Sequence, residues 1–363
     1  MSLKLLLQAR RLQFLHTRTR IALMPLALHS TFAGVLTSIP SPPVSYFDLG
    51  PLRIHFYALC IIVGIIAATL LTNYRLTKRG AEPWVVIDIA ILAVPLGIIG
   101  ARIFHVLTHP NFYFGPDKNT WNPFEPGSVW AIWEGGIAIF GALIGGAVGA
   151  YLGCKWTGIR FWSFADALAP GLLLAQAFGR FGNWFNHELF GLPTDLPWGL
   201  EIASDNAAFP PGLADGTLFH PTFLYEVVWN TLGVLFLIWI GRRLHLQWGK
   251  VFALYLIWYG AGRIVWESIR VDPSEIIFGL RSNVWAAIVG VIVGVVILFV
   301  QTRRHTGTEA TPYASGRARK DLDADVQSQE SLDDFVDVSE PPVEFTAEAT
   351  ATSDASAGAE GSR

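Results

Sequence analysis

The amino-acid sequence predicts an all-α, polytopic transmembrane helical bundle of about seven spans, with an external head segment between the fourth and fifth spans. Of the 363 residues, 52% are hydrophobic and 15% are charged, and the mean hydropathy of +0.41 is too high for a soluble domain. Apolar runs recur that approach the roughly twenty residues a helix needs to cross a bilayer core. Lys and Arg residues follow every second run, as expected for a chain that crosses a membrane repeatedly.

Each span is placed on one of these apolar runs. The expected spans are residues 54–73, 84–107, 130–153, 161–179, 221–241, 251–270 and 283–301. Lys and Arg are concentrated after the first, third, fifth and seventh spans, and positively charged loops tend to stay in the cytoplasm. The C-terminus is therefore expected in the cytoplasm, with residue 54 and the segment 181–220 outside.

Two terminal regions differ in composition from this transmembrane domain, which is expected to cover 41–301. Residues 1–40 form a basic N-terminal extension that is either a signal-like segment, an eighth span, or a result of translation that really begins at Met24. Residues 305–363 hold thirteen acidic and four basic residues, a charge of −9 that leaves +6 on the rest. The region 302–363 is therefore expected to be a disordered acidic cytoplasmic tail.

The sequence gives no indication of a metal, a cofactor or a nucleic-acid partner. Cys60 and Cys154 both lie within apolar runs, where a packed small residue is the simpler interpretation than a disulfide or a metal ligand. No His, Cys or Asp spacing typical of a metal site occurs.

Ionisable side chains inside a membrane span cost free energy, so each one calls for a reason. In "YGAGRIVWESIR", Arg263, Glu267 and Arg270 are spaced i, i+4 and i+7, which puts them on one face of a helix. One carboxylate cannot neutralise two guanidinium groups. The spare positive charge favours an anionic ligand.

A second polar cluster occurs in "GRFGNWFNHELFG", residues 179–191. Arg180 is followed by Asn183, Asn186 and Glu188, among glycines that allow turns or close backbone approach. Three arginines near the outer membrane boundary favour a phosphate ligand, because a guanidinium group stays charged and binds phosphate oxygens in pairs. At that depth, an anionic phospholipid headgroup supplies the phosphate.

This second stretch resembles the signature of the prolipoprotein diacylglyceryl transferase family, a Gly-Arg-x-Gly-Asn-x-x-Asn-x-Glu-x-x-Gly pattern. Other family-like stretches follow the expected order: "LRIHFYALCIIVG", "GGIAIFGALIGG", "HPTFLYE" and "YGAGRIVWESIR". The resemblance covers about residues 36–301. It implies transfer of the diacylglyceryl group of phosphatidylglycerol to the lipobox cysteine of a bacterial prolipoprotein, with formation of a thioether and release of glycerol phosphate.

The resemblance also implies partners and a location. The partners would be phosphatidylglycerol, the prolipoprotein signal peptide with its lipobox cysteine, and membrane lipids. The enzyme would lie in the bacterial cytoplasmic (inner) membrane as a multi-pass protein, with its active site facing outward. Because the leaving phosphate gains negative charge in the transition state, fixed arginines would stabilise that state.

The resemblance implies site residues at the positions that match the family's motifs. The catalytic group would be Arg180, Arg263, Glu267 and Arg270. The substrate-binding group would be Tyr57, Asn183, Asn186, Glu188, Gly191, His220 and Glu226. For His220 and Glu226, a helix cap and a satisfied buried pair are equally good interpretations.

One position departs from the family pattern, and one other function class fits. Phe140 stands where many members carry a histidine that has been cast as the base for the thiol. His187 is the preferred substitute over His55 and His105, with Glu188 or Glu267 as further alternatives; an arginine nearby would also lower the thiol pKa from about 8.5. An anionic-lipid transporter or flippase would place arginines in a membrane cavity too, but no internal repeat of the transporter kind is found.

Overall fold

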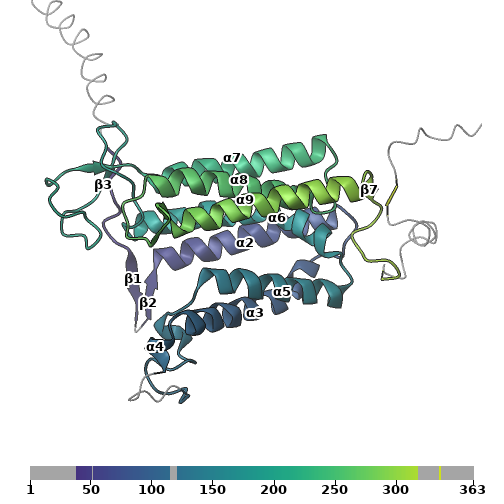
Figure 1. Cartoon of the computed structure of the whole chain (residues 1–363), viewed down its shortest axis with the longest axis horizontal. Helices are drawn as coiled ribbons and strands as arrows, with labels where there is room; N and C mark the ends of the chain where they lie inside the picture. The colour runs from purple at the N-terminus through teal and green to yellow at the C-terminus, as the bar shows by residue number, and fades with distance from the viewer. Residues whose placement is uncertain (1–37, 51, 115–120, 318–334, 337–363) are drawn as a thin grey trace, which may run out of the picture.

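The computed structural model describes residues 38–50, 52–114, 121–317 and 335–336, and the account below concerns these residues. Long helices run side by side along one direction (Figure 1). They are α2 (Phe56–Thr77), α3 (Val85–Thr108), α5 (Ile139–Thr157), α6 (Phe161–Phe185), α7 (Thr222–Arg243), α8 (Lys250–Ser268) and α9 (Ser282–Arg304). All but α8 are long and apolar enough to cross a membrane by length and composition. The predicted polytopic helical bundle is confirmed, and α8 packs among the other helices.

The two ends of the bundle carry different segments. One end, left in Figure 1, bears residues 186–221 and is called the head end; the other bears residues 305–317 and is called the tail end. Helix α6 rises toward the head end, α7 descends from it, and α8 rises again. The direction of each helix fixes the depth of the side chains it carries.

The predicted start of the third span is wrong. Helix α5 begins at Ile139 rather than at residue 130, and residues before it form only a short 3-10 turn, Ile132–Glu134. Gly135 and Gly136 have φ angles of 95° and 70°, which break a right-handed helix. The Arg102 guanidinium holds this non-helical loop by donating hydrogen bonds to backbone carbonyls, among them that of Gly135 at 2.8 Å.

The fourth span also differs, at its end. Helix α6 continues to Phe185 instead of residue 179, so the segment between α6 and α7 begins at residue 186. The helix stops where His187 and Leu189 adopt left-handed backbone conformations, with φ of 53° and 60°. The first half of the "GRFGNWFNHELFG" stretch is therefore helical and projects its polar side chains from a rigid element.

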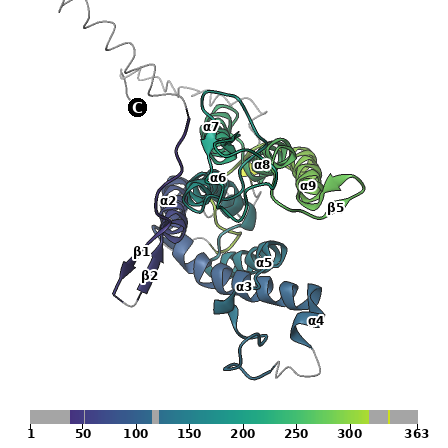
Figure 2. The same cartoon turned by 90° about the vertical axis from the view of Figure 1, so that its left-hand side faces the viewer.

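Helices α3 and α5 form a close pair (Figure 2). Gly141 and Gly145 of α5 face Gly100 and Leu96 of α3, and a Cβ atom added at Gly145 would lie 2.1 Å from the Leu96 carbonyl oxygen. Small residues let the two backbones approach, which is a usual source of helix association in membranes. Gly149 makes the same kind of contact one turn further along α5, since a Cβ there would lie 2.5 Å from the Leu92 carbonyl oxygen.

Short strands lie at the head end. β1 (Tyr46–Leu49) and β2 (Leu52–His55) form a hairpin beside α2, and β5 (Ile276–Ile277) pairs with β6 (Leu280–Arg281). β3 (Leu200–Glu201) pairs with β4 (Leu218–Phe219) within the 186–221 segment. The head segment closes over a core of its own: Phe190, Leu200, Ile202, Phe219 and Phe223.

The N-terminal side of the domain begins earlier than predicted. Ile39 pairs in parallel with Leu200, and its N–H donates to the Gly199 carbonyl at 2.8 Å. Residues 38–40 therefore belong to the head segment and not to the extension 1–40. The predictions for the start at Met24 and for a signal-like segment or an eighth span lie outside the described residues.

The predicted disordered tail starts too early as well. Helix α9 continues to Arg304, and residues 305–317 pack against the loops at the tail end. Tyr313 is buried, and its hydroxyl accepts a hydrogen bond from the Glu82 N–H at 2.9 Å. Apart from β8 (Phe335–Val336), which pairs with β7 (Thr308–Glu309), the remainder of the tail lies outside the described residues.

The glycine contact between α3 and α5 can be tested by adding bulk. We expect Gly145→Val to force the two helices apart and to lower the melting temperature in detergent, because overpacking costs about 1–3 kcal/mol. Gly290→Val is the matched control, since a Cβ at Gly290 of α9 meets nothing within 4 Å. Equal melting temperatures for the two variants would contradict the close pairing.

Candidate active site

Polar side chains from three helices meet at the head end. Arg180 lies near the end of α6, Glu226 in the second turn of α7, and Arg263 and Glu267 in the last turns of α8. Because α6 and α8 end at this level and α7 begins there, helix direction alone brings residues from distant parts of the chain to one depth.

The Glu226 carboxylate joins two of the arginines. Its Oε2 atom lies 2.9 Å from Nε of Arg180 and 3.8 Å from Nη1 of Arg263. The Glu226 side chain is only 5% exposed, whereas the two guanidinium groups are 15% and 16% exposed. The carboxylate thus lies behind the arginines, which retain access to a ligand.

Glu267 is the second centre of charge. Its side chain is fully buried and accepts from Arg263 at 2.8 Å and from Arg270 at 3.2 Å. Arg281 and Asn283 donate to its other oxygen, each at 2.9 Å. A buried carboxylate is tolerated only when such partners satisfy it, so Glu267 is built to hold these groups in place.

Asp272 completes the ion-paired group. It accepts from Arg270 at 2.7 Å and from Arg281 at 2.9 Å. Four guanidinium groups and three carboxylates are therefore connected by direct ion pairs, which leaves one formal positive charge. The positive excess inferred from the sequence is present, but it arises from a different set of partners than the i, i+4, i+7 triplet alone.

One N–H donor in this group makes no hydrogen bond. Nη1 of Arg263 is buried, and no hydrogen-bond acceptor reaches it among the described residues. An unsatisfied buried N–H is costly. This donor is therefore suited to an oxygen atom of a ligand that the protein itself does not supply.

A layer of amides extends from Arg180 into the head segment. Arg180 donates to Oδ1 of Asn183 at 3.2 Å, and Asn183 donates to Glu188 at 3.0 Å. Asn186 donates to the same Glu188 oxygen at 3.2 Å. The structure brings these three predicted residues together, with Glu188 linked to Arg180 through Asn183.

Two glycines of residues 179–191 allow close contacts with other elements. A Cβ at Gly182 would lie 2.5 Å from the Tyr57 ring, so Tyr57 of α2 packs on α6 two residues after Arg180. The Gly191 N–H donates to the His220 carbonyl at 2.9 Å, and Gly191 also bridges to Arg270. Gly191 therefore joins the head segment to the end of α8.

His220 has a different environment from the arginines. Its Nδ1 lies 3.1 Å from the Tyr225 hydroxyl, which also accepts from the Trp198 indole N–H at 3.1 Å. Its backbone carbonyl receives the Gly191 N–H. These contacts make His220 a connector between the head segment and α7.

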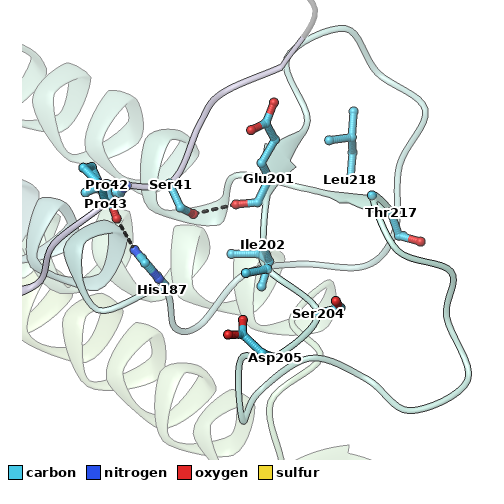
Figure 3. Close-up of a pocket in the computed structure, with 12 residues that line it drawn as sticks. Ser41, Pro42, Pro43, His187, Glu201, Ile202, Ser204, Asp205, Thr217 and Leu218 are labelled. Carbon is cyan, nitrogen blue, oxygen red and sulfur yellow. Dashed lines mark hydrogen bonds between the residues drawn. The ribbon is translucent and has the colours of Figure 1, made fainter.

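His187 is the predicted base that the structure places elsewhere. Its Nε2–H donates to the Pro42 carbonyl at 2.7 Å, and the ring lines a cavity of about 690 Å³ in the head segment (Figure 3). Figure 3 shows the ring facing Pro42 and Ser41. The backbone at His187 is left-handed, and among the described residues the side chain makes no hydrogen bond to the arginines.

Two other positions discussed for thiol activation, His105 and Phe140, also contact other residues. His105 stacks on His109 with ring centroids 4.3 Å apart and contacts the Tyr113 hydroxyl. Phe140, at the start of α5, contacts Phe104 of α3. Neither position contributes a titratable group to the ion-paired group.

Sequence reasoning missed three members of the cluster: Arg281, Asp272 and Asn283. All three lie between α8 and α9 or at the start of α9. A signal was available, because Arg281 directly precedes the last apolar run.

The chain was compared with known proteins. The family model for prolipoprotein diacylglyceryl transferase matches residues 44–300. The chain is 61% identical over 301 residues to a phosphatidylglycerol–prolipoprotein diacylglyceryl transferase of Leifsonia xyli subsp. xyli, covering 82% of this chain and 90% of that protein.

Relatives of the same name in other genera are also similar. A Cutibacterium acnes protein is 47% identical, covering 74% of this chain and 88% of its own length. A Streptomyces coelicolor protein is 44% identical, with 76% and 84% covered. The match to the family model, which spans the helical bundle and the arginine cluster, shows that this chain belongs to the prolipoprotein diacylglyceryl transferase family.

Proposed function

We propose that this protein transfers the diacylglyceryl group of phosphatidylglycerol to the lipobox cysteine of a bacterial prolipoprotein. The relatives are named for phosphatidylglycerol and prolipoprotein. The observation that carries the proposal is the pair of partly exposed arginines on one buried carboxylate, with Nη1 of Arg263 3.8 Å from that carboxylate and without a hydrogen bond among the described residues.

In the proposed reaction, the cysteine sulfur attacks the glycerol carbon that bears the phosphate. A carbon–sulfur bond forms while the bond from that carbon to the phosphate oxygen breaks, and glycerol phosphate leaves with the electron pair. The thiol proton passes to a base or to water. Because negative charge grows on the departing phosphate, guanidinium groups held in advance stabilise the transition state more than the ground state.

Each member of the cluster has a proposed role. Arg180 and Arg263 bind the phosphate, and Glu226 holds the two like charges beside one another. Glu267 orients Arg263 and is itself satisfied by Arg270. Arg281 and Asn283 belong to the same support, since both donate to Glu267.

Thiol activation is proposed to rely on the local positive charge. Phe140 cannot accept a proton, and the His187 side chain is hydrogen-bonded to the Pro42 carbonyl. A thiol beside a guanidinium group has a lowered pKa, which raises the thiolate fraction without a dedicated base. Asn183, Asn186, Glu188 and Tyr57 are proposed to shape the substrate site around this chemistry.

The protein is a multi-pass membrane protein, and we propose that its head end faces outward from the cytoplasmic membrane. The Lys and Arg residues that follow alternate spans support this orientation, with the tail end and the C-terminus in the cytoplasm. The acceptor, a signal peptide carrying the lipobox cysteine, would then arrive at the arginine cluster from the membrane.

The arginine assignment predicts a large loss of activity. We expect Arg180→Ala and Arg263→Ala each to lower the rate of diacylglyceryl transfer by about 10²–10³, the usual cost of removing one transition-state donor. The measurement is mass spectrometry of a lipobox peptide incubated with the protein in phosphatidylglycerol vesicles.

A matched control and an alternative outcome make that test specific. Arg53→Ala removes an exposed arginine of the β1–β2 hairpin that pairs with Asp48 at 3.0 Å and lies over the Tyr46 ring, and it should leave the rate unchanged. Full activity in both cluster variants would refute the assignment. Movement of lipid across the bilayer with no mass gain on the peptide would favour the transporter.

The position of His187 leads to a second prediction. We expect His187→Asn to retain transfer within about threefold, because the ring stabilises the 38–43 segment and asparagine tolerates the left-handed backbone. A loss comparable to that of Arg263→Ala, in a variant that melts like the unmodified protein, would restore His187 as the base.

The contacts of Gly191 lead to a further prediction about the transfer rate. A Cβ in Gly191→Ala would lie 2.7 Å from Cβ of His220, so the head segment must move relative to α8. We expect a ten- to hundredfold lower transfer rate, since small displacements of positioning groups have effects of that order. Gly241→Ala, where the nearest atom is 3.4 Å away, is the control and should be unaffected.

A further inference from the structure

Two amide side chains lie one helical turn below the arginine cluster. Gln176 precedes Arg180 by four residues on α6, and Asn230 follows Glu226 by four residues on α7. Because α6 rises to the head end and α7 descends from it, both amides lie about 6 Å deeper than the ion pair above them. They extend the polar site toward the membrane interior.

Both amides carry a polar atom without a partner. Asn230 is only 2% exposed, and its Nδ2 is buried with no hydrogen bond among the described residues. Oε1 of Gln176 is likewise buried and unpaired, while its Nε2 donates to the Tyr255 hydroxyl at 3.1 Å. Since a hydroxyl can donate or accept, the Gln176 amide can turn and present N–H groups instead.

These unpaired atoms do not stabilise the fold. Leaving a buried amide unsatisfied costs free energy, and an apolar side chain of the same shape would avoid that cost. Directly below, the core between α6, α7 and α8 is apolar, with Leu173, Val234, Leu237 and Val251 buried. The two unpaired amides therefore lie between the arginine cluster and this apolar layer.

Space is available beside them. A Cβ atom added at Gly179, between Gln176 and Arg180 on α6, would meet nothing within 4 Å. Gln176, Arg180 and Asn183 are spaced i, i+4 and i+7 and so share one face of α6 next to this space. A ligand held by the arginines can extend along that face.

We propose that Gln176 and Asn230 donate hydrogen bonds to the ester carbonyls of the diacylglyceryl group and so position the reacting glycerol carbon beneath the phosphate. This inference rests on the proposed function. In a diacyl glycerophospholipid, the ester carbonyls lie a few bonds from the phosphate on the acyl-chain side. A phosphate at Arg180 and Arg263 places those carbonyls deeper in the membrane, at the level of the two amides. Both are positioning residues, and neither touches the bond that breaks.

The test compares two donor lipids that differ only at these carbonyls. They are phosphatidylglycerol with two ester-linked chains and its dialkyl ether analogue, which keeps the phosphate and the reacting carbon but lacks both carbonyl groups. We expect the unmodified protein to prefer the diester about three- to tenfold in kcat/KM, the size of a neutral hydrogen bond.

The variants Asn230→Leu and Gln176→Met should each reduce this preference toward one while leaving the melting temperature unchanged or higher. Gln301→Leu is the matched control, because Gln301 of α9 also carries a buried unpaired Oε1 but lies at the tail end. It should keep the full diester preference.

The outcomes distinguish a failure of this inference from a failure of the proposed function. If the unmodified protein transfers lipid from neither donor, the proposed function fails. If it uses both donors equally well, or if both variants keep the diester preference, the function stands and the carbonyl site is overturned. The comparison in the unmodified protein needs no variant to fold.

Discussion

The site depends on a carboxylate shared by two guanidinium groups in a part of the protein that is largely shielded from water. Glu226 lies behind Arg180 and Arg263, with only 5% of its side chain exposed. Two like charges at this depth would repel one another strongly in a medium of low dielectric constant. The shared anion makes their proximity tolerable, and it leaves the outward sides of both arginines free. A second carboxylate, Glu267, lies one turn nearer the head end, where it fixes Arg263 and is itself held by Arg281 of β6 and Asn283 of α9.

The arrangement follows from helix direction and from small residues at chosen contacts. Arg180, Glu226 and Arg263 come from three helices that reach the same level, and no single segment holds the site. Gly182 admits the Tyr57 ring, and Gly191 lets the head segment approach α8. The polar groups are thereby mounted on rigid helices and braced by the loops that join them, which is the usual condition for charges that must be in place before the reaction begins.

Much of this could be predicted from the sequence, and the failures have physical causes. The apolar runs located the long helices, and the i, i+4, i+7 spacing placed Arg263 and Glu267 on one face. Residues 130–138 are apolar enough to read as a span, yet two glycines with positive φ make them a loop. Arg281 was overlooked because a charge at a helix boundary needs no explanation by itself; its pairing with Glu267 is a property of the three-dimensional structure. His187 was preferred because the topology puts it at the same end of the bundle as the arginines; its contact with Pro42 and its left-handed backbone conformation are properties of the three-dimensional structure.

The segment 305–317 has a consequence for how the bundle is completed. The hydrogen bond between Glu82 and Tyr313 joins residues 231 positions apart, and its closing requires nearly the whole helical domain to be synthesised and placed. Contacts of such long sequence separation form late, because the entropy of closing the intervening chain must first be overcome. Docking of this short segment would then mark the end of assembly, and a chain cut off after its last helix would leave the loops at the tail end without the segment that joins them.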